Sequence, residues 1–237
     1  MFASFFELIY PRRCAICGQI VTPKGYYVHE ECRKRLHFVT EPRCARCGKP
    51  LLEQEQEYCY DCSKKNFHYQ KGFSLVRYDD LMKHSIAEFK YNGKKEYADF
   101  YVTELLDRYG QDLTNLQLDC IVPVPIHSSK RLGRGFNQAG LIAVGLGKGL
   151  FLPVIEDLLI RNKKTLPQKQ LNDKERLANL SEAFEMNSRY DLRGINKVLI
   201  VDDIYTTGST IEACTKILSQ AGISQVYFIT VCIGQGF

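Results

Sequence analysis

The first quarter of the chain carries cysteine and histidine residues at a spacing that suits metal binding. Seven of the ten cysteines lie before Ser63, and with one histidine they form four pairs, with two residues inside each pair and eleven between consecutive pairs. The pairs are Cys14/Cys17, His29/Cys32, Cys44/Cys47 and Cys59/Cys62. Two side chains three positions apart on a tight turn can point at one tetrahedral Zn²⁺, for which neutral imidazole is also a good ligand. We therefore predict structural zinc, two ions in all.

The pairs differ in the residues that follow them. Gly18 and Gly48 come directly after the first and third pairs, where glycine suits the strained backbone of a metal-binding knuckle. The second and fourth pairs run into segments typical of helix starts. We expect one site from the first two pairs and a second from the last two. The even spacing leaves open an interleaved arrangement in which the two knuckles share one ion. It also leaves open that His29 is an unrelated surface histidine.

Disulfides and thioredoxin-like redox pairs are the alternatives to zinc. A catalytic Cys-x-x-Cys normally lies on a βαβ unit, and no such pattern surrounds these pairs. No stretch approaches the ~20 apolar residues of a membrane-spanning helix. The apolar segment 1–11 is shorter than that and lacks a cleavage site, so we expect a short helix packed against the zinc module. The expectation is a cytoplasmic protein with no membrane span, whose thiols stay reduced.

A second chemical motif lies near the C-terminus, in residues 197–210. An apolar strand ends in Asp202 and Asp203, and a loop of hydroxyl residues and one glycine then leads into a helix. The loop backbone and the helix N-terminus can bind a phosphate, whereas the two acids make sense only beside sugar hydroxyls or a divalent cation. A capped helix after a buried strand would explain the hydroxyls but not the adjacent acids. The loop residues are Thr206, Thr207, Gly208, Ser209 and Thr210.

Composition and periodicity indicate the fold that must position these groups. A chain of 237 residues with 45% hydrophobic residues, 25% charged residues and a net charge of +5 is an ordinary globular protein, compatible with phosphorylated ligands or nucleic acid but requiring neither. The later segments alternate between strand and helix, which predicts an α/β fold with a mostly parallel sheet flanked by helices. We expect strands at 73–78, 120–125, 197–201 and 225–233, and helices at 79–90, 96–108, 137–150 and 209–220. The expected division is a zinc-binding module over 1–68 and an α/β domain over 69–237, with 69–72 as a linker.

The segment VLIVDDIYTTGST resembles the motif with which type I phosphoribosyltransferases bind 5-phosphoribosyl-1-pyrophosphate (PRPP). With the zinc module and the RGFNQ segment at 134–138, the chain resembles the ComF family of bacterial competence proteins (ComFC-like, related to GntX) over essentially its full length. The resemblance implies a type I phosphoribosyltransferase-like fold that binds PRPP, or a related phosphorylated ligand, with Mg²⁺. Asp202 and Asp203 would contact the ribose hydroxyls, directly or through Mg²⁺, and residues 206–210 would hold the 5-phosphate.

The resemblance also assigns residues between the two motifs. Segment 126–134 takes the place of the pyrophosphate-binding loop, where basic residues suit a polyanion. These basic residues are Lys130, Arg131 and Arg134. In an active enzyme the catalytic residues would be Asp202, Asp203, Arg131 and Arg134. The polar stretch 161–179 is similar to a family pattern that would form a hood over the site, and a surface linker is the alternative. Lys90 matches a further recurring position, with no role derived from its surroundings in the sequence.

Three functions are compatible with these residues. The ComF resemblance implies DNA uptake in natural transformation, through handling of single-stranded DNA and often beside a competence helicase. Basic and aromatic residues near the zinc pairs give mild support, because cations bind phosphates and rings stack on bases. These residues are Arg12, Arg13, Arg33, Lys34, Arg35, Lys64 and Lys65, with Tyr26, Tyr27, Phe38, Tyr58 and Phe67. The alternatives are an active phosphoribosyltransferase in nucleotide or amine metabolism whose acceptor is unknown, and a zinc-module adaptor for a helicase or another protein.

Overall fold

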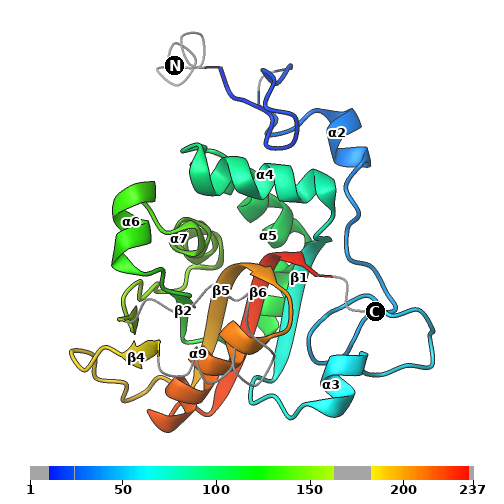
Figure 1. Cartoon of the computed structure of the whole chain (residues 1–237). Helices are drawn as coiled ribbons and strands as arrows, with labels where there is room; N and C mark the ends of the chain where they lie inside the picture. The colour runs from blue at the N-terminus through cyan, green and yellow to red at the C-terminus, as the bar shows by residue number, and fades with distance from the viewer. Residues whose placement is uncertain (1–10, 24, 163–182, 235–237) are drawn as a thin grey trace.

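The computed structural model describes residues 11–23, 25–162 and 183–234, and within them the centre of the fold is a four-stranded parallel sheet (Figure 1). The strand order is β1-β6-β5-β2. The strands are β1 (Lys71–Arg77), β2 (Cys120–Pro123), β5 (Lys197–Tyr205) and β6 (Gln225–Ile233). A separate antiparallel pair is formed by β3 (Leu159–Arg161) and β4 (Phe184–Met186). The predicted α/β class with a mostly parallel sheet is confirmed.

Helices cover both faces of the sheet because the strand residues are apolar on both sides. In β5, Leu199 and Val201 join the hydrophobic cluster of one face, and Val198 and Ile200 join that of the other. A strand that is buried on both faces has a continuously apolar sequence, which is usual for parallel strands. The first face is covered by α4 (Asp80–Tyr91), α5 (Tyr97–Asn115) and α7 (Gln138–Leu150). The second is covered by α9 (Ser209–Gln220).

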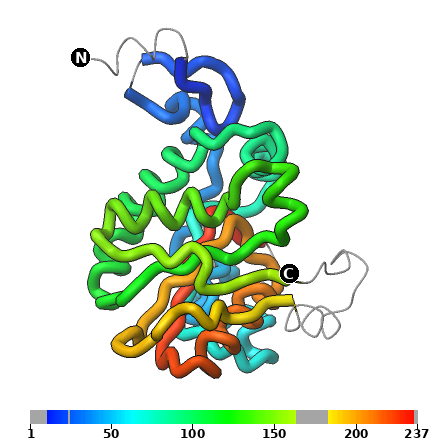
Figure 2. Tube along the Cα trace, turned by 90° about the vertical axis from the view of Figure 1, so that its left-hand side faces the viewer, coloured from blue at the N-terminus to red at the C-terminus, as the bar shows by residue number. Residues whose placement is uncertain are grey.

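The N-terminal residues form two small cysteine-rich units, called ribbon one and ribbon two below, whose apolar side chains join the hydrophobic clusters on opposite sides of the sheet. Ribbon one (residues 12–36) contains α2 (Glu30–Lys34), and ribbon two (residues 43–65) contains α3 (Tyr60–Lys64). The apolar side chains of ribbon one belong to the cluster of α4, α5 and α7, whereas those of ribbon two belong to the cluster of α9. Figure 2 shows ribbon one at one end of the molecule and ribbon two near α9 at the other.

The connection between the ribbons runs along the outer edge of β1. The Val39 amide donates to the Leu75 carbonyl at 2.9 Å, and the Arg77 amide donates to the His37 carbonyl at 2.8 Å. This strip covers backbone groups that would otherwise form an open sheet edge. The segment that connects the ribbons is therefore hydrogen-bonded to the α/β fold. The division into a zinc module over residues 1–68 and an α/β domain over residues 69–237 stays a proposal.

Several element boundaries differ from those expected. The expected linker at 69–72 already belongs partly to β1, because the carbonyl of Val226 receives the amide of Gln70 at 2.7 Å. Strand β5 continues past its two acids to Tyr205, since β6 pairs with it to the end. Part of the expected loop at 126–134 is the helix α6 (Ser128–Arg134), capped by His127.

Two expectations concern residues outside the described ranges. They are the N-terminal helix within residues 1–10 and most of the hood, which falls in residues 163–182. Among the described helices, none is long and apolar enough to cross a membrane.

Candidate functional site

The structure brings the eight predicted metal ligands together as two separate sets of four. One set is Cys14, Cys17, His29 and Cys32, and the other is Cys44, Cys47, Cys59 and Cys62. Within each set all ligand atoms lie within 4.8 Å of one another. Each set therefore combines one knuckle with one helix-borne pair, which is the sequential arrangement and not the interleaved one.

The details of both sets fit tetrahedral zinc. Zn–S bonds of about 2.3 Å place the sulfurs of one tetrahedron roughly 3.8 Å apart. The Cys47 and Cys59 sulfurs are 3.6 Å apart, and His29 Nδ1 lies 3.4 Å from the Cys17 sulfur. His29 Nε2 lies 2.9 Å from the Ile20 carbonyl, so the ring can donate there and keep Nδ1 for a metal. These contacts join His29 to the first set.

The second predicted site lies where parallel strands β5 and β6 end, which is where α/β folds bind ligands. After Tyr205 the chain turns through Thr206 and Thr207 into α9, with Gly208 at the N-cap position. Gly208 has φ +81°, and a Cβ there would lie 2.6 Å from the Tyr205 hydroxyl, so only glycine fits without strain. The hydroxyls of Thr207 and Ser209 are 3.0 Å apart. This segment, which we call the phosphate loop (residues 206–210), presents backbone amides and hydroxyls at one helix start.

Asp203 forms an ion pair that the sequence did not suggest. Lys90 Nζ, at the end of α4, lies 2.9 and 2.8 Å from the two carboxylate oxygens of Asp203. The Lys90 side chain is 18% exposed and that of Asp203 14% exposed. Burial alone would lower the pKa of Lys90, but the charge and hydrogen bond of Asp203 outweigh it and hold the pKa above its ordinary value. Lys90 is therefore charged and held against Asp203, three residues before the phosphate loop.

Of the two adjacent carboxylates, Asp202 has the less well compensated charge. Burial, followed by the nearby charge of Asp203, raises its pKa from 3.8 to about 7. The Asp203 amide, which donates to Asp202 at 2.8 Å, and the charge of Lys90 offset this only in part. A nearby cation or hydroxyl donor stabilises the ionised form of such a carboxylate, so the pair fits a Mg²⁺ ion or ribose hydroxyls.

Further cations gather at the same edge. Burial lowers the pKa of Lys130, and so do the charges of Arg161, Arg134 and Lys90, whereas Asp203 opposes them. The Arg134 guanidinium lies 4.7 Å from the centre of the Tyr91 ring and donates to Gln138 at 3.2 Å. Arg131 is exposed on α6 and lines an adjoining cavity. A cluster of like charges near two acids and a phosphate loop is suited to a polyanion.

Many of the residues expected to contact DNA near the zinc pairs have partners inside the protein. Arg33 makes a two-pronged ion pair with buried Glu104, with distances of 2.6 and 2.9 Å. Arg12 lies over the Tyr27 ring at 4.5 Å. Phe67 stacks on Tyr69 with ring centres 5.1 Å apart. The exposed rings that remain for stacking in the described ribbons are Tyr26, Tyr58 and Tyr60.

Sequence reasoning left the roles of three parts of this site unassigned. They are Lys90, Arg161 and the exit of ribbon two at Phe67 and His68, which lies against the phosphate loop and α9. Lys90 and Arg161 were noticed only as matches to family positions. No local pattern marks such residues, because each depends on contacts with distant segments.

Comparison with known proteins agrees with both halves of the chain. Residues 5–63 match the family model of the double zinc ribbon domain. The chain is 29% identical over 215 residues to competence protein F of Haemophilus influenzae, covering 82% of this chain and 92% of that protein. It is 27% identical over 197 residues to competence protein ComFC of Bacillus subtilis, covering 81% and 77%. It is 30% identical over 222 residues to the DNA utilization protein YhgH of Salmonella typhimurium, covering 92% and 89%.

Proposed function

Because this chain belongs to the ComF family of competence and DNA utilization proteins, we propose that it acts in the uptake or use of DNA. The names of its relatives support this role at the level of the process. The site at the end of β5 supports a more specific proposal, which is that the protein binds Mg²⁺ and PRPP and handles single-stranded DNA in the cytoplasm.

The observation that carries the ligand proposal is the pairing of two carboxylates with a phosphate loop. Lys90 holds Asp203 in place at 2.8 Å, so Asp202 and Asp203 are fixed next to a loop that presents amides and hydroxyls. PRPP carries both chemical groups that such a site suits, namely a 5-phosphate and a ribose with free hydroxyls. Lys130, Arg134 and Arg161 then face the charge of the pyrophosphate.

The chain's own residues would hold this ligand mainly by position and charge. The amides at the start of α9 and the hydroxyls of Thr207 and Ser209 donate to the 5-phosphate. Asp202 and Asp203 accept hydrogen bonds from the ribose hydroxyls. Mg²⁺, when bound, neutralises charge on the pyrophosphate oxygens.

Calorimetric titration of the zinc-loaded chain with PRPP, with and without Mg²⁺, tests this proposal. We expect saturable binding that requires Mg²⁺. Asp202→Asn with Asp203→Asn should weaken it by more than about a hundredfold, because each charged hydrogen bond contributes about 1.5–3 kcal/mol. Asp107→Asn with Asp112→Asn, an equal charge change on exposed positions of α5, should leave it unchanged. Wild-type affinity in the site variant would remove the assignment.

Handling of single-stranded DNA is supported best on ribbon two. In ribbon one, Arg33 and Lys34 are engaged by Glu104, Glu30 and Glu31, which reduces their use for phosphates. Ribbon two exposes Lys64 beside Tyr60, which is 75% exposed. Fluorescence anisotropy with a labelled single-stranded oligonucleotide across a salt series measures the affinity for DNA and its dependence on salt concentration. Lys64→Gln should lower the salt slope by about one, and Lys148→Gln on α7 should not. A slope independent of Lys64 would place DNA elsewhere.

Transfer of the phosphoribosyl group is a second candidate function. A cavity of about 250 Å³ adjoins α6, and Arg131, Asn137 and Arg161 contribute to its lining, so a small acceptor has room beside the cations. The test is pyrophosphate release from Mg·PRPP when ammonia, amines or nucleobases are added. If PRPP binds but none of the candidate acceptors causes pyrophosphate release, a ligand-binding role without turnover is favoured.

A further inference from the structure

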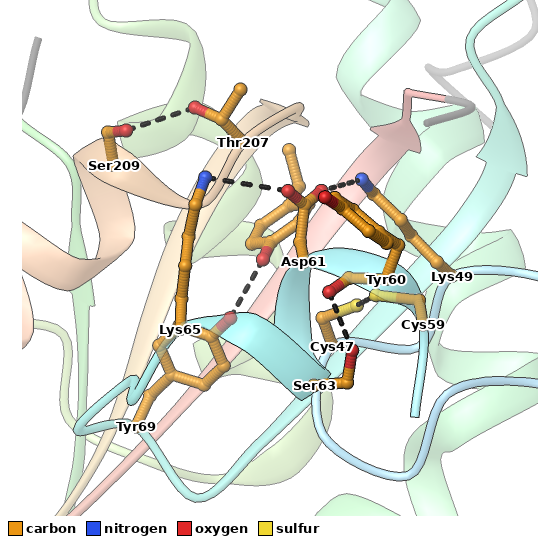
Figure 3. Close-up of polar contacts among 11 residues, drawn as sticks. Cys47, Lys49, Cys59, Tyr60, Asp61, Ser63, Lys65, Tyr69, Thr207 and Ser209 are labelled. Atoms are coloured by element: carbon orange, nitrogen blue, oxygen red, sulfur yellow. Dashed lines mark hydrogen bonds and ion pairs between the residues drawn. The ribbon is translucent and has the colours of Figure 1, made fainter. Parts of the chain in front are cut away.

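The exit of ribbon two (residues 67–69) lies directly against the phosphate loop. Phe67 borders the same small space as the Tyr205 hydroxyl, since a Cβ added to Gly208 would lie 3.1 Å from the Phe67 ring. Figure 3 shows the side chains of ribbon two and Tyr69 in one region with Thr207 and Ser209. The loop predicted to bind phosphate is therefore in contact with a segment that starts five residues after the last zinc ligand, Cys62.

A pair of buried tyrosines forms the first connection. The hydroxyls of Tyr69 and Tyr205 are 2.7 Å apart, and both residues are 2% exposed. Their rings enclose Phe228, with the Tyr205 ring stacked on it at 4.8 Å and the Tyr69 ring edge-on at 4.9 Å. A buried hydroxyl pair in an apolar setting fixes both rings, because separating them leaves two polar groups without partners. Tyr205 is the residue immediately before the phosphate loop.

A histidine and a glutamate form the second connection. The His68 amide donates to one Glu212 oxygen at 2.9 Å, and His68 Nδ1 pairs with the other oxygen. Glu212 lies in the first turn of α9 and is only 3% exposed. Its negative charge stands at the helix end that would receive a phosphate, where it opposes an incoming anion. His68 binds both oxygens and so partly compensates this charge, with Lys216 at 3.7 Å as a weaker partner.

The same segment is tied to the second zinc set. Tyr69 and Tyr205 share one hydrophobic cluster with Cys44, Cys47, Cys59 and Cys62. Buried Lys49, just after the knuckle, pairs with Asp61 of α3 at 2.7 Å and joins the two halves of the ribbon (Figure 3). Ribbon one has no such link among the described contacts, and its ties run to α4 and α5 on the other face.

We propose that Phe67, His68 and Tyr69 are positioning residues of the phosphate loop, so that an intact ribbon two sets the loop's geometry and ribbon one does not. The ligand part of this inference rests on the proposed function. By thermodynamic reciprocity, a phosphate ligand that needs the ordered loop also stabilises the exit of ribbon two.

Hydrogen–deuterium exchange and PRPP titration of the zinc-loaded full chain test the inference together. His68→Ala should speed exchange of residues 206–212 and weaken Mg·PRPP binding about tenfold, the order expected for loss of a charged hydrogen bond. His68→Asn keeps a donor near the Nδ1 position and should restore much of both. The control, Arg33→Gln with Glu104→Gln, loosens the ion pair of ribbon one and should leave the exchange of residues 206–212 unchanged.

The outcomes separate the two proposals. If the wild type binds no PRPP, the proposed ligand fails, and the exchange data alone then decide whether residues 67–69 position the loop. Unchanged exchange at 206–212 in His68→Ala, with zinc still bound, would overturn the positioning role. Equal acceleration in the ribbon-one control would also overturn it, because the effect would then be general loosening.

Discussion

Asp202 offers a test of how the site's electrostatics affect the stability of the unliganded protein. Its pKa is raised from 3.8 to about 7, by burial first and then by Asp203. Between these two values the folded chain keeps a proton that the unfolded chain has released. Folding stability therefore falls as pH rises through this window and levels off above pH 7, because stability decreases with pH wherever the folded state binds more protons.

The size of the effect follows from the same pKa. Each pH unit inside the window changes the free energy of unfolding by about 1.36 kcal/mol per proton. From pH 5.5 to 8 this gives roughly 2 kcal/mol, because Asp202 is still half-protonated at pH 7. The Asp202 side chain keeps some exposure to solvent, which makes this value an upper limit. Asp202→Asn carries no proton to lose and can still accept the Asp203 amide at its side-chain oxygen.

Urea denaturation at pH 5.5, 6.25, 7 and 8, without Mg²⁺ or PRPP, measures the change. We expect Asp202→Asn to gain up to about 2 kcal/mol relative to wild type between pH 5.5 and 8, with most of the gain below pH 7 and little above pH 7.5. Staying above pH 5.5 limits protonation of the zinc thiolates. Asp112→Asn on the exposed face of α5 is the control for charge removal. A stability difference that stays constant with pH, or shrinks as pH rises, would refute this reading of Asp202.

Three other perturbations give direct outcomes. Lys90→Met leaves a buried carboxylate without its cation, so it should cost roughly 3 kcal/mol in urea denaturation, while full stability would show that the ion pair contributes nothing. Gly208→Ala should lower stability by about 1–2 kcal/mol and weaken PRPP binding, whereas Gly110→Ala on α5, with open space around it, should do neither. Elemental analysis should find two zinc ions per chain, and Cys59→Ala and Cys17→Ala should each reduce this to one. Of these two variants, only Cys59→Ala should speed amide exchange in residues 206–210, and equal effects would contradict the separate roles of the ribbons.

The parts of this fold that the sequence predicts are those written in local patterns. The ligand spacing predicts four side chains per zinc set because a knuckle and a helix start each present two ligands on one side. The apolar run at 197–201 predicts a strand, and the glycine and hydroxyl residues after it predict a phosphate loop. These patterns need no knowledge of the rest of the chain.

The parts that the sequence does not predict depend on partners far away in it. Lys90 and Asp203 are 113 residues apart, and only the packing of α4 against the sheet brings them together. Strand β5 continues through two acids, which strands seldom favour, because β6 supplies hydrogen bonds up to Tyr205. The burial of Asp202 follows from the same packing, so neither its pKa nor its lack of a full partner was visible in the motif.

The placement of the two ribbons connects each zinc site with a different part of the ligand site. Ribbon one touches α4 through the Ala15 carbonyl and Ser85, and the same helix ends at Lys90, which holds Asp203. Ribbon two touches the phosphate loop through Phe67 and Glu212 through His68. The sheet separates these two routes, because the ribbons belong to different hydrophobic clusters. Zinc loss at the first site should therefore act on the acidic half of the pocket, and zinc loss at the second on the half that would receive the phosphate.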